Sequence, residues 1–425
     1  MLAEVVRQVP SLLDFVQAES LAPLLSTCKQ LRCYVQSFVS SICCATHADF
    51  HILVSIDWPR LRSLDLRNVS LDAELMAQLN AAAYTLLTSL CLNGCGGLQV
   101  AGISEFVKGH YLLLESLDLS SVKLNAMSAS PLREGDWPLL RHLDLHANHM
   151  GAEAMGALIK CNLPLLESLS IGDNWFHGPA TGAELAKGKW PLLQKLVLMW
   201  TDIEAEELKM VLDGDWPELE DLDLSHDVYL KSDAIEALSE ATWRIKRLML
   251  VDIRLDKEGI FALVKGAWTS LEVLDLSANN LDADAMIWFM YAELPVLKSF
   301  ELSANRIDRA AVRNLAQCAC PKHKYLGLRE NNLSTAAIKD LFLGRWPFLE
   351  RLDVSDNNLD HDARMVLSGH NQPLMESLNY IQHPAHVGFG RWLHLKFVDI
   401  SRHDTKVERI SGLVEGVDVE VIDDD

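Results

Sequence analysis

Apolar residues recur along this chain in a short pattern that repeats at a nearly constant interval. The segment LRSLDLRNVSL begins at Leu61, and twelve later segments share its spacing of apolar positions. Ten of the twelve intervals between segments are 26 residues long and two are 27. A fixed period of this size indicates a solenoid of stacked units, numbered here as coils 1 to 13. The segments begin at Leu61, Leu87, Leu114, Leu140, Leu166, Leu193, Leu219, Ile245, Leu271, Leu297, His323, Leu349 and Met375.

Each segment begins with the pattern of a β-strand and ends in a turn. In coil 9, Leu274 and Leu276 are two residues apart and share one strand face, while Asp275 lies on the other. Asn279 starts the turn, where its amide can bond backbone groups that a solenoid would otherwise bury unpaired. Asparagine holds the same position at Asn148, Asn174, Asn305, Asn331 and Asn357, whereas Val69, Val122 and Ile253 replace it in coils 1, 3 and 8.

A helix is expected after each turn. The stretches DAELMAQLNAAA after Leu71 and DADAMIWFMYAE after Leu281 have apolar residues at helical spacing over about three turns. Proline then ends the helix and returns the chain to an extended strand. The tryptophan before it is expected between the coils, where a large ring gains most from burial. These pairs are Trp58-Pro59, Trp137-Pro138, Trp190-Pro191, Trp216-Pro217 and Trp346-Pro347.

The units resemble leucine-rich repeats of the ribonuclease-inhibitor and cysteine-containing subfamilies, from roughly Trp58 to Ile400. Cys95 and Cys320-Pro321 match cysteine-containing positions of that pattern. The resemblance implies an α/β fold, a right-handed leucine-rich-repeat solenoid or horseshoe, with parallel strands on the concave face and helices on the convex face. We expect residues 1–50 to form a helical N-terminal cap, 51–382 an array of about 13 repeats, and 383–425 a C-terminal capping strand and an acidic tail.

Part of the N-terminal segment is similar to the second half of an F-box. The first half fits poorly, because Pro10 falls where a helix should continue. This resemblance implies a Skp-type adaptor as partner and a role as substrate receptor of an SCF-type ubiquitin ligase. The alternative is a helical cap that covers coil 1 and binds nothing. The residues that carry the resemblance, and would bind the adaptor, are Leu21, Leu24, Cys28 and Leu31.

Charge and composition narrow the partner and the compartment. Lys and Arg total 38 against 59 Asp and Glu, a formal charge of −21, which disfavours nucleic acid and anionic membranes as partners. The nine cysteines lack framework spacing, the N-terminus lacks a signal-peptide pattern, and charges interrupt every long apolar run. We therefore expect a cytoplasmic protein, with the nucleus as the alternative, whose partner is another protein.

Catalytic and metal-binding patterns are weak. The sequence has no Gly-rich phosphate loop, His-Glu-x-x-His motif or nucleophile elbow. His142, Asp144 and His146 share one strand face, as zinc ligands can. Aspartate recurs at the central position in other coils, however, which favours an ordinary solvated strand face. We expect no enzyme, no cofactor and no metal site.

An apolar interruption of the polar strand face predicts where a partner binds. In most coils the outward positions are polar, like Asp118 and Ser120 in coil 3. Apolar clusters on a polar surface tend to mark binding sites, and strands about 4.8 Å apart would gather this one into a patch roughly 10 Å across. The alternative is that Trp200 folds back over Trp175 or the coil edge. The predicted partner-binding residues are Val197, Met199 and Trp200 in coil 6, His226 in coil 7, and Met249 and Val251 in coil 8.

Three functions fit these observations. The first is a scaffold that holds a partner protein on its concave face, and the second is the substrate receptor with an adaptor-binding N-terminus. The third is a GTPase activator similar to the Ran-activating repeat proteins, whose polar turn residues have no clear match in this sequence. Because one fold hosts many functions, the fold alone does not separate them.

Overall fold

The computed structural model describes residues 16–17, 39–109, 111–176, 178–318, 322–343, 348–357, 359 and 377–379. The chain divides into two compact units, Met1–Leu219 and Glu220–Asp425, and each is described by itself. The predicted closing strand at residues 391–401 and the F-box-like residues Leu21, Leu24, Cys28 and Leu31 lie outside the described residues.

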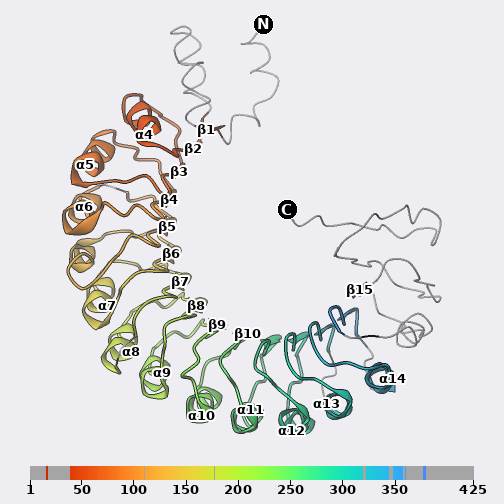
Figure 1. Ribbon diagram of the computed structural model, residues 1–425. Helices are drawn as coiled ribbons and strands as arrows, with labels where there is room; N and C mark the ends of the chain where they lie inside the picture. Colours follow the sequence, from red (N-terminus) through yellow and green to blue (C-terminus); the bar gives the residue numbers. More distant parts are fainter. Residues whose placement is uncertain are drawn as a thin grey trace, which may run out of the picture. The chain divides into compact units, whose positions relative to one another are not determined.

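Short parallel strands alternate with helices in the first unit. Equivalent leucines lie opposite one another in the ladder, so that Leu117 pairs with Leu143 and Leu143 with Leu169. Figure 1 shows the strands on one side of this unit and the helices on the other, which we call the strand face and the helical face. The elements are β1 (Val16–Gln17), β2 (Ser41–Cys43), α4 (His47–Val54), β3 (Ser63–Asp65), α5 (Ala73–Ala81), β4 (Ser89–Cys91), α6 (Gln99–Val107), β5 (Ser116–Asp118), the 3₁₀-helix η2 (Ser130–Glu134), β6 (His142–Asp144), α7 (Ala152–Leu158), β7 (Ser168–Ser170), α8 (Ala180–Leu185), β8 (Lys195–Val197) and α9 (Ala205–Leu212).

The second unit repeats the same arrangement. Its strands are parallel and in register, with Leu248 opposite Leu274 and Leu274 opposite Phe300. Its helices again lie on the side away from the strands (Figure 1). The elements are β9 (Asp221–Asp223), α10 (Ser232–Glu240), β10 (Arg247–Met249), α11 (Lys257–Val264), β11 (Val273–Asp275), α12 (Ala283–Met286), the 3₁₀-helix η3 (Ile287–Tyr291), β12 (Ser299–Glu301), α13 (Arg309–Leu315), β13 (Tyr325–Gly327), α14 (Thr335–Leu343), β14 (Arg351–Asp353) and β15 (Ser377–Asn379).

Four leucine positions per coil form the core between strands and helices. In coil 9 these are Leu271, Leu274, Leu276 and Leu281, all of them buried. Full burial of one such side chain contributes about 1.5–3 kcal/mol before entropy is counted. Because no coil can cover its own apolar face, this burial depends on the neighbouring coils.

The predicted asparagine ladder is confirmed. Asn305 Nδ2 donates to the carbonyl of Leu302 in its own coil (2.9 Å) and to that of Leu276 in the preceding coil (3.0 Å). Its Oδ1 accepts from the backbone N–H groups of Asn279 (3.0 Å) and Leu281 (2.9 Å). One side chain therefore satisfies four buried backbone groups on two coils. Equivalent bonds come from Asn148, Asn174, Asn279, Asn331 and Asn357.

The tryptophan positions are interior, as predicted. Trp58, Trp137, Trp190 and Trp216 are all buried, and the last two rings stack with centroids 6.1 Å apart. The Trp216 indole N–H donates to the Gly188 carbonyl (3.0 Å), so its polar atom is satisfied as well. Trp346 lies outside the described residues.

The helices after the turns are slightly shorter than the predicted three turns, and one of them is only partly α-helical. The stretch after Leu71 forms α5, which has nine residues or about two and a half turns. The stretch after Leu281 forms only four α-helical residues, and the segment IWFMY continues as the 3₁₀-helix η3. Aromatic and β-branched residues lose side-chain freedom in an α-helix, which weakens the α-helical propensity of this segment.

Candidate protein-binding site

A column of carboxylates lies on the strand face, and each carboxylate has a local structural role. Asp144 Oδ1 accepts the backbone N–H of His146 (2.8 Å), two residues further on. Asp275 does the same for Ser277 (2.9 Å). This contact is an Asx turn, which orders the chain as it leaves the strand. The sequence pattern indicated only a solvated face for these residues. The same bond is made by Asp65, Asp118, Asp223, Asp353 and, through its longer side chain, Glu301.

His142, Asp144 and His146 lie on β6 and the turn that follows it. His142 is exposed, and Asp144 is engaged with the backbone of the turn. Nδ1 of His146 would be 3.0 Å from a Cβ placed on Gly172, and Met199 Cγ would be 2.9 Å from that same point. The side chains of His146 and Met199 therefore close over Gly172 from the coils on either side. Across the described ranges, no group of three or more His, Cys, Asp or Glu residues could hold a metal ion.

Coil 6 interrupts the carboxylate column with an apolar residue. Val197 stands at the end of β8 where seven described coils have Asp or Glu. A valine side chain cannot accept a hydrogen bond, so this coil lacks the Asx turn. Val197 and Met199 are both half-buried and lie on the strand face of the first unit. They form, with Trp200, an apolar group on an otherwise polar face.

Trp200 lies in a backbone position that every repeat requires and that suits tryptophan poorly. In coils 1 to 12 the seventh position after the coil start has positive φ, as in Asn68 (62°), Gly94 (69°) and Trp200 (61°). The left-handed conformation costs residues with a Cβ roughly 1–2 kcal/mol, and glycine and asparagine tolerate it best. The Trp200 side chain is 51% exposed, against 2% for Trp190 in the packing column. Trp200 is therefore not a core residue.

The second unit contains the remaining predicted residues. Met249 ends β10 at the carboxylate position, and Val251 follows two residues later; both are half-buried. His226 has a φ of 64°, and its Nδ1 lies 3.4 Å from Asp252 Oδ2. The apolar group of coil 6 belongs to the first unit and these residues belong to the second. That both groups form one patch therefore stays a prediction.

Sequence reasoning missed the contacts of Glu301, a half-buried carboxylate on the strand face of the second unit. Tyr325 donates its hydroxyl hydrogen to Glu301 Oε2 (2.8 Å). Burial raises the pKa of the Glu301 carboxyl, and the negative charges of Asp275 and Asp353 raise that pKa further. A Cβ on Gly327 would lie 1.8 Å from Glu301 Oε1, so any larger residue there would displace the Glu301 carboxylate. A glycine in a normally polar column is the signal that could have indicated this packing.

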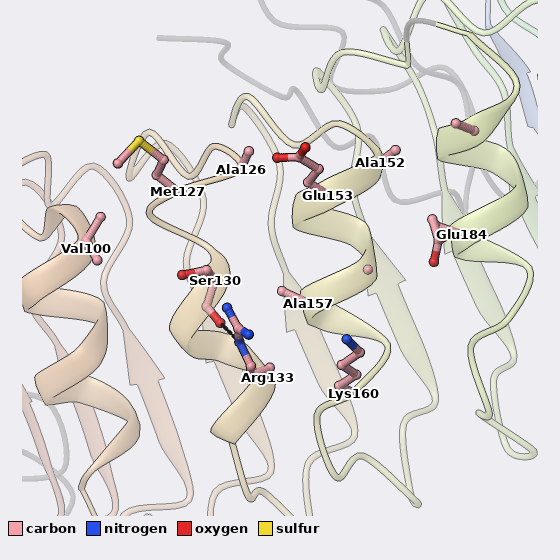
Figure 2. A pocket seen from close by; sticks show the side chains of 12 residues that line it. Val100, Ala126, Met127, Ser130, Arg133, Ala152, Glu153, Ala157, Lys160 and Glu184 are labelled. Carbon is pink, nitrogen blue, oxygen red and sulfur yellow. Dashed lines mark hydrogen bonds between the residues drawn. The ribbon is translucent and has the colours of Figure 1, made fainter.

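A hollow of about 700 Å³ opens on the helical face of the first unit (Figure 2). It arises where η2 stands between α6 and α7 in place of a full α-helix, and Pro131 at the start of η2 was the available signal. Its walls combine small residues with Arg133, Lys160, Glu153 and Glu184. The hydrogen bond drawn in Figure 2 joins Arg133 Nε to the Ser130 carbonyl (2.7 Å) and holds the turn.

The part of the chain that the structure describes contains no helix with both the length and the apolar character needed to cross a bilayer.

These features define a class. Parallel strands at a 26-residue period, leucine columns beneath them, an asparagine ladder and helices on the opposite side make this chain a leucine-rich-repeat solenoid. No family model matches the sequence, and no curated protein matches it either.

Two solved structures share the fold. Rad7, in the crystal structure of the Rad7 and Elc1 complex in yeast, has a TM-score of 0.51 and 17% identity, over 88% of this chain and 90% of that chain. TLR13, in its complex with ssRNA13, has a TM-score of 0.51 and 20% identity, over 87% of this chain and 47% of that chain. At these identities the likeness shows the fold alone, and this chain matches only about half of TLR13.

Proposed function

We propose that this chain is a protein-interaction scaffold that binds a partner protein on the strand face of its repeats. The observation that carries the proposal is Val197, an apolar residue at a position where seven described coils have a carboxylate bonded to the backbone. Valine in place of the carboxylate removes the hydrogen bond to the turn, and together with Met199 and Trp200 it adds exposed apolar area. A bound partner would convert that area into binding energy. In this proposal the chain is not itself an enzyme and needs no cofactor.

The second unit supports the proposal independently. Met249 repeats the exchange of a carboxylate for an apolar residue, and Val251 extends the apolar surface toward the turn. His226 in the turn of coil 7 and Asp252 in the turn of coil 8 add a polar pair beside this surface. We propose that the partner contacts both groups, with Trp200 and Met249 as the principal anchors, because large exposed apolar side chains are favoured in interface cores.

The test uses the full chain as bait, with the captured proteins identified by mass spectrometry. Val197→Asp should keep the melting temperature, because aspartate can remake the Asx turn found in the other coils, yet it should lose the partner. Leu112→Asp is the matched control: Leu112 is 47% exposed in the turn before β5, so it should retain both fold and partner. Capture of the same proteins by wild type and by Val197→Asp would refute a strand-face site.

The second candidate is a substrate receptor that also binds an adaptor through its N-terminus. The likeness to Rad7, solved in complex with Elc1, spans 88% of this chain and favours this candidate over other repeat functions. The adaptor would contact the F-box-like residues Leu21, Leu24, Cys28 and Leu31. Leu24→Asp should then weaken binding of a Skp-type adaptor to the full chain, whereas Val197→Asp should leave that binding intact. A wild-type chain that binds no such adaptor leaves the scaffold function alone.

A further inference from the structure

Two tryptophans and two aspartates are exposed on neighbouring turns of the first unit. Asp173 and Trp175 belong to the turn of coil 5, after β7, and Trp200 and Asp202 belong to the turn of coil 6, after β8. Trp175 is 56% exposed and Trp200 is 51% exposed, so both rings remain accessible from solvent. We call these four residues the tryptophan–aspartate cluster.

Backbone hydrogen bonds between the two turns determine which cluster residues are neighbours. The N–H of Asp173 donates to the Met199 carbonyl (2.8 Å), so Asp173 lies beside Trp200. The peptide group that follows Trp175 likewise donates its N–H to the carbonyl of the peptide group before Asp202 (3.2 Å). Each tryptophan therefore has an aspartate as its neighbour on the adjacent coil, and rings and carboxylates alternate around the cluster.

Packing within the fold explains little of this arrangement. The intervening residues Asn174 and Thr201 are buried, so the turns alternate inward and outward residues and the rings lie on the outward side. His149 of coil 4 contacts the Trp175 ring, with centroids 4.7 Å apart, and Asp202 lies on the opposite side, in coil 6. Large exposed rings gathered on a polar turn are typical of a binding surface.

The carboxylates of the cluster differ from those of the strand column. In that column, Asp144 accepts a backbone N–H of its own turn (2.8 Å). Among the residues that the structure describes, neither Asp173 nor Asp202 forms an ion pair or a side-chain hydrogen bond. Two negative charges therefore lie available beside two rings, on a chain whose formal charge is −21. The complementary occupant is a cation.

We propose that the tryptophan–aspartate cluster binds an arginine side chain of the partner protein, an inference that rests on the proposed strand-face function. A guanidinium group is planar, so it can stack on an indole ring while the N–H groups in its plane donate to carboxylates beside that ring. Alternating rings and carboxylates meet both requirements, whereas the compact ammonium group of lysine has no plane to stack. The second unit shows such stacking within the chain, where the guanidinium carbon of Arg351 lies 5.1 Å from the Tyr325 ring centroid.

The experiment records fluorine NMR spectra of the full chain labelled with fluorotryptophan while a short Gly-Ser peptide with one arginine is added. Trp175→Ser and Trp200→Asn each remove one of the 11 tryptophan resonances and so assign it; coil 1 has Ser70 and Asn68 at these positions. We expect both assigned resonances to shift saturably, whereas that of the buried Trp190 stays in place. The same peptide with citrulline, which lacks the charge, should cause no shift, and the lysine peptide should bind more weakly.

Variants of the aspartates test the contribution of the carboxylates. Asp173→Asn and Asp202→Asn should each weaken binding of the arginine peptide roughly threefold, and the double variant roughly tenfold. Asp215→Asn is the matched control, because Asp215 is an exposed aspartate of the same unit outside the cluster, and it should bind like wild type. Equal shifts with the arginine and citrulline peptides overturn the proposal, as does unchanged binding by the double variant.

This inference and the strand-face function can fail separately. Capture of a partner that Val197→Asp loses, but that the double variant of Asp173 and Asp202 retains at wild-type affinity, overturns the arginine site and leaves the function in place. Arginine-specific shifts of the Trp175 and Trp200 resonances, in a chain whose captured proteins are unaffected by Val197→Asp, support the arginine site and refute the function.

Discussion

Asn305 links two coils through its side-chain amide, and the repeat depends on such single residues. The buried N–H groups of Asn279 and Leu281 bond to its Oδ1, and the carbonyls of Leu276 and Leu302 share its Nδ2 with the amides of Asn279 and Asn331. In coil 2 a cysteine replaces asparagine and makes one of the equivalent bonds: Cys95 donates its thiol hydrogen to the Leu66 carbonyl of the preceding coil (3.1 Å). Hydrogen-bonding chemistry therefore explains the asparagine and cysteine in this column, whereas coils 1, 3 and 8 have Val69, Val122 and Ile253 there.

Replacing Asn305 should destabilise the second unit strongly. Asn305→Ala leaves the backbone N–H groups of Asn279 and Leu281 without their acceptor, and each buried unsatisfied group costs about 1–3 kcal/mol, partly relieved by water entry. We expect the free energy of unfolding to fall by about 2–4 kcal/mol in urea denaturation. Glu236→Ala, on the exposed side of α10, is the control and should change it by less than about 0.5 kcal/mol. A comparable loss in both variants would mean that the ladder contributes little.

Trp190, which is buried just before coil 6, and Trp200, which is exposed within coil 6, should respond oppositely to substitution. Trp190→Ala removes a buried ring that stacks on Trp216, which should cost about 3–5 kcal/mol of stability. Trp200→Asn places asparagine in a left-handed position where coil 1 already has Asn68, so the melting temperature should stay close to that of wild type. Partner binding should fall roughly thirtyfold or more for Trp200→Asn. If Trp200→Asn unfolds the chain as readily as Trp190→Ala, Trp200 is a packing residue.

At the scale of the elements, aspartate side chains cap the N-termini of several of the short helices. Asp256 precedes α11 in an extended conformation, and its Oδ1 accepts the backbone N–H of Gly259 (2.8 Å). Asp308 caps α13 in the same way through Ala311. Isolated helices of seven to nine residues are unstable in water, so capping and packing together hold them.

The contribution of one cap can be measured at α11. Asp256→Ala removes the side-chain acceptor and should lower the free energy of unfolding by about 1 kcal/mol. Asp256→Asn keeps an acceptor of similar geometry and should stay within about 0.5 kcal/mol of wild type. Thermal unfolding followed by circular dichroism distinguishes the two. Equal losses for alanine and asparagine would attribute the effect to charge rather than to the cap.

At the scale of the whole molecule, stability should depend on pH through one buried histidine and two half-buried carboxyls that act in opposite directions. Burial lowers the pKa of His323 to about 4, although Nε2 can donate to the Tyr325 carbonyl (2.8 Å). Burial raises the pKa of Asp275 and of Glu301. Between pH 6.5 and 4, His323 is protonated in the unfolded chain but stays neutral in the folded chain. Stability therefore falls as the pH falls through this range. The two carboxyls act in the opposite direction, because acidification protonates them more readily in the folded state.

A variant at coil 11 separates these effects. His323→Leu restores the leucine found at this position in most coils and removes the acid-sensitive group. We expect wild type to lose up to about 3 kcal/mol more stability than this variant between pH 6.5 and 4, by urea denaturation at each pH. His142→Leu, at an exposed histidine, should keep the wild-type dependence. Parallel curves for wild type and His323→Leu would contradict the assignment.

The sequence by itself determined the repeat, the leucine columns, the asparagine ladder and the buried tryptophans. These follow from local chemistry repeated at a fixed interval, and a solenoid stacks equivalent positions such as Leu248 and Leu274 directly on each other. The apolar residues Val197 and Met249 were also visible as departures from the polar pattern, although their role is a proposal.

Only the tertiary structure decided how individual side chains use that framework. The aspartate column reads as polar surface, but its bonds to the turn depend on backbone dihedral angles that the sequence does not specify. Glu301 folds over Gly327 of the next coil, a contact that requires both coils in place. The segment Ile287–Tyr291 continues α12 as a 3₁₀-helix, which the helical spacing of its apolar residues did not specify. Periodicity fixes which residues share a column, whereas side-chain contacts depend on the geometry between columns.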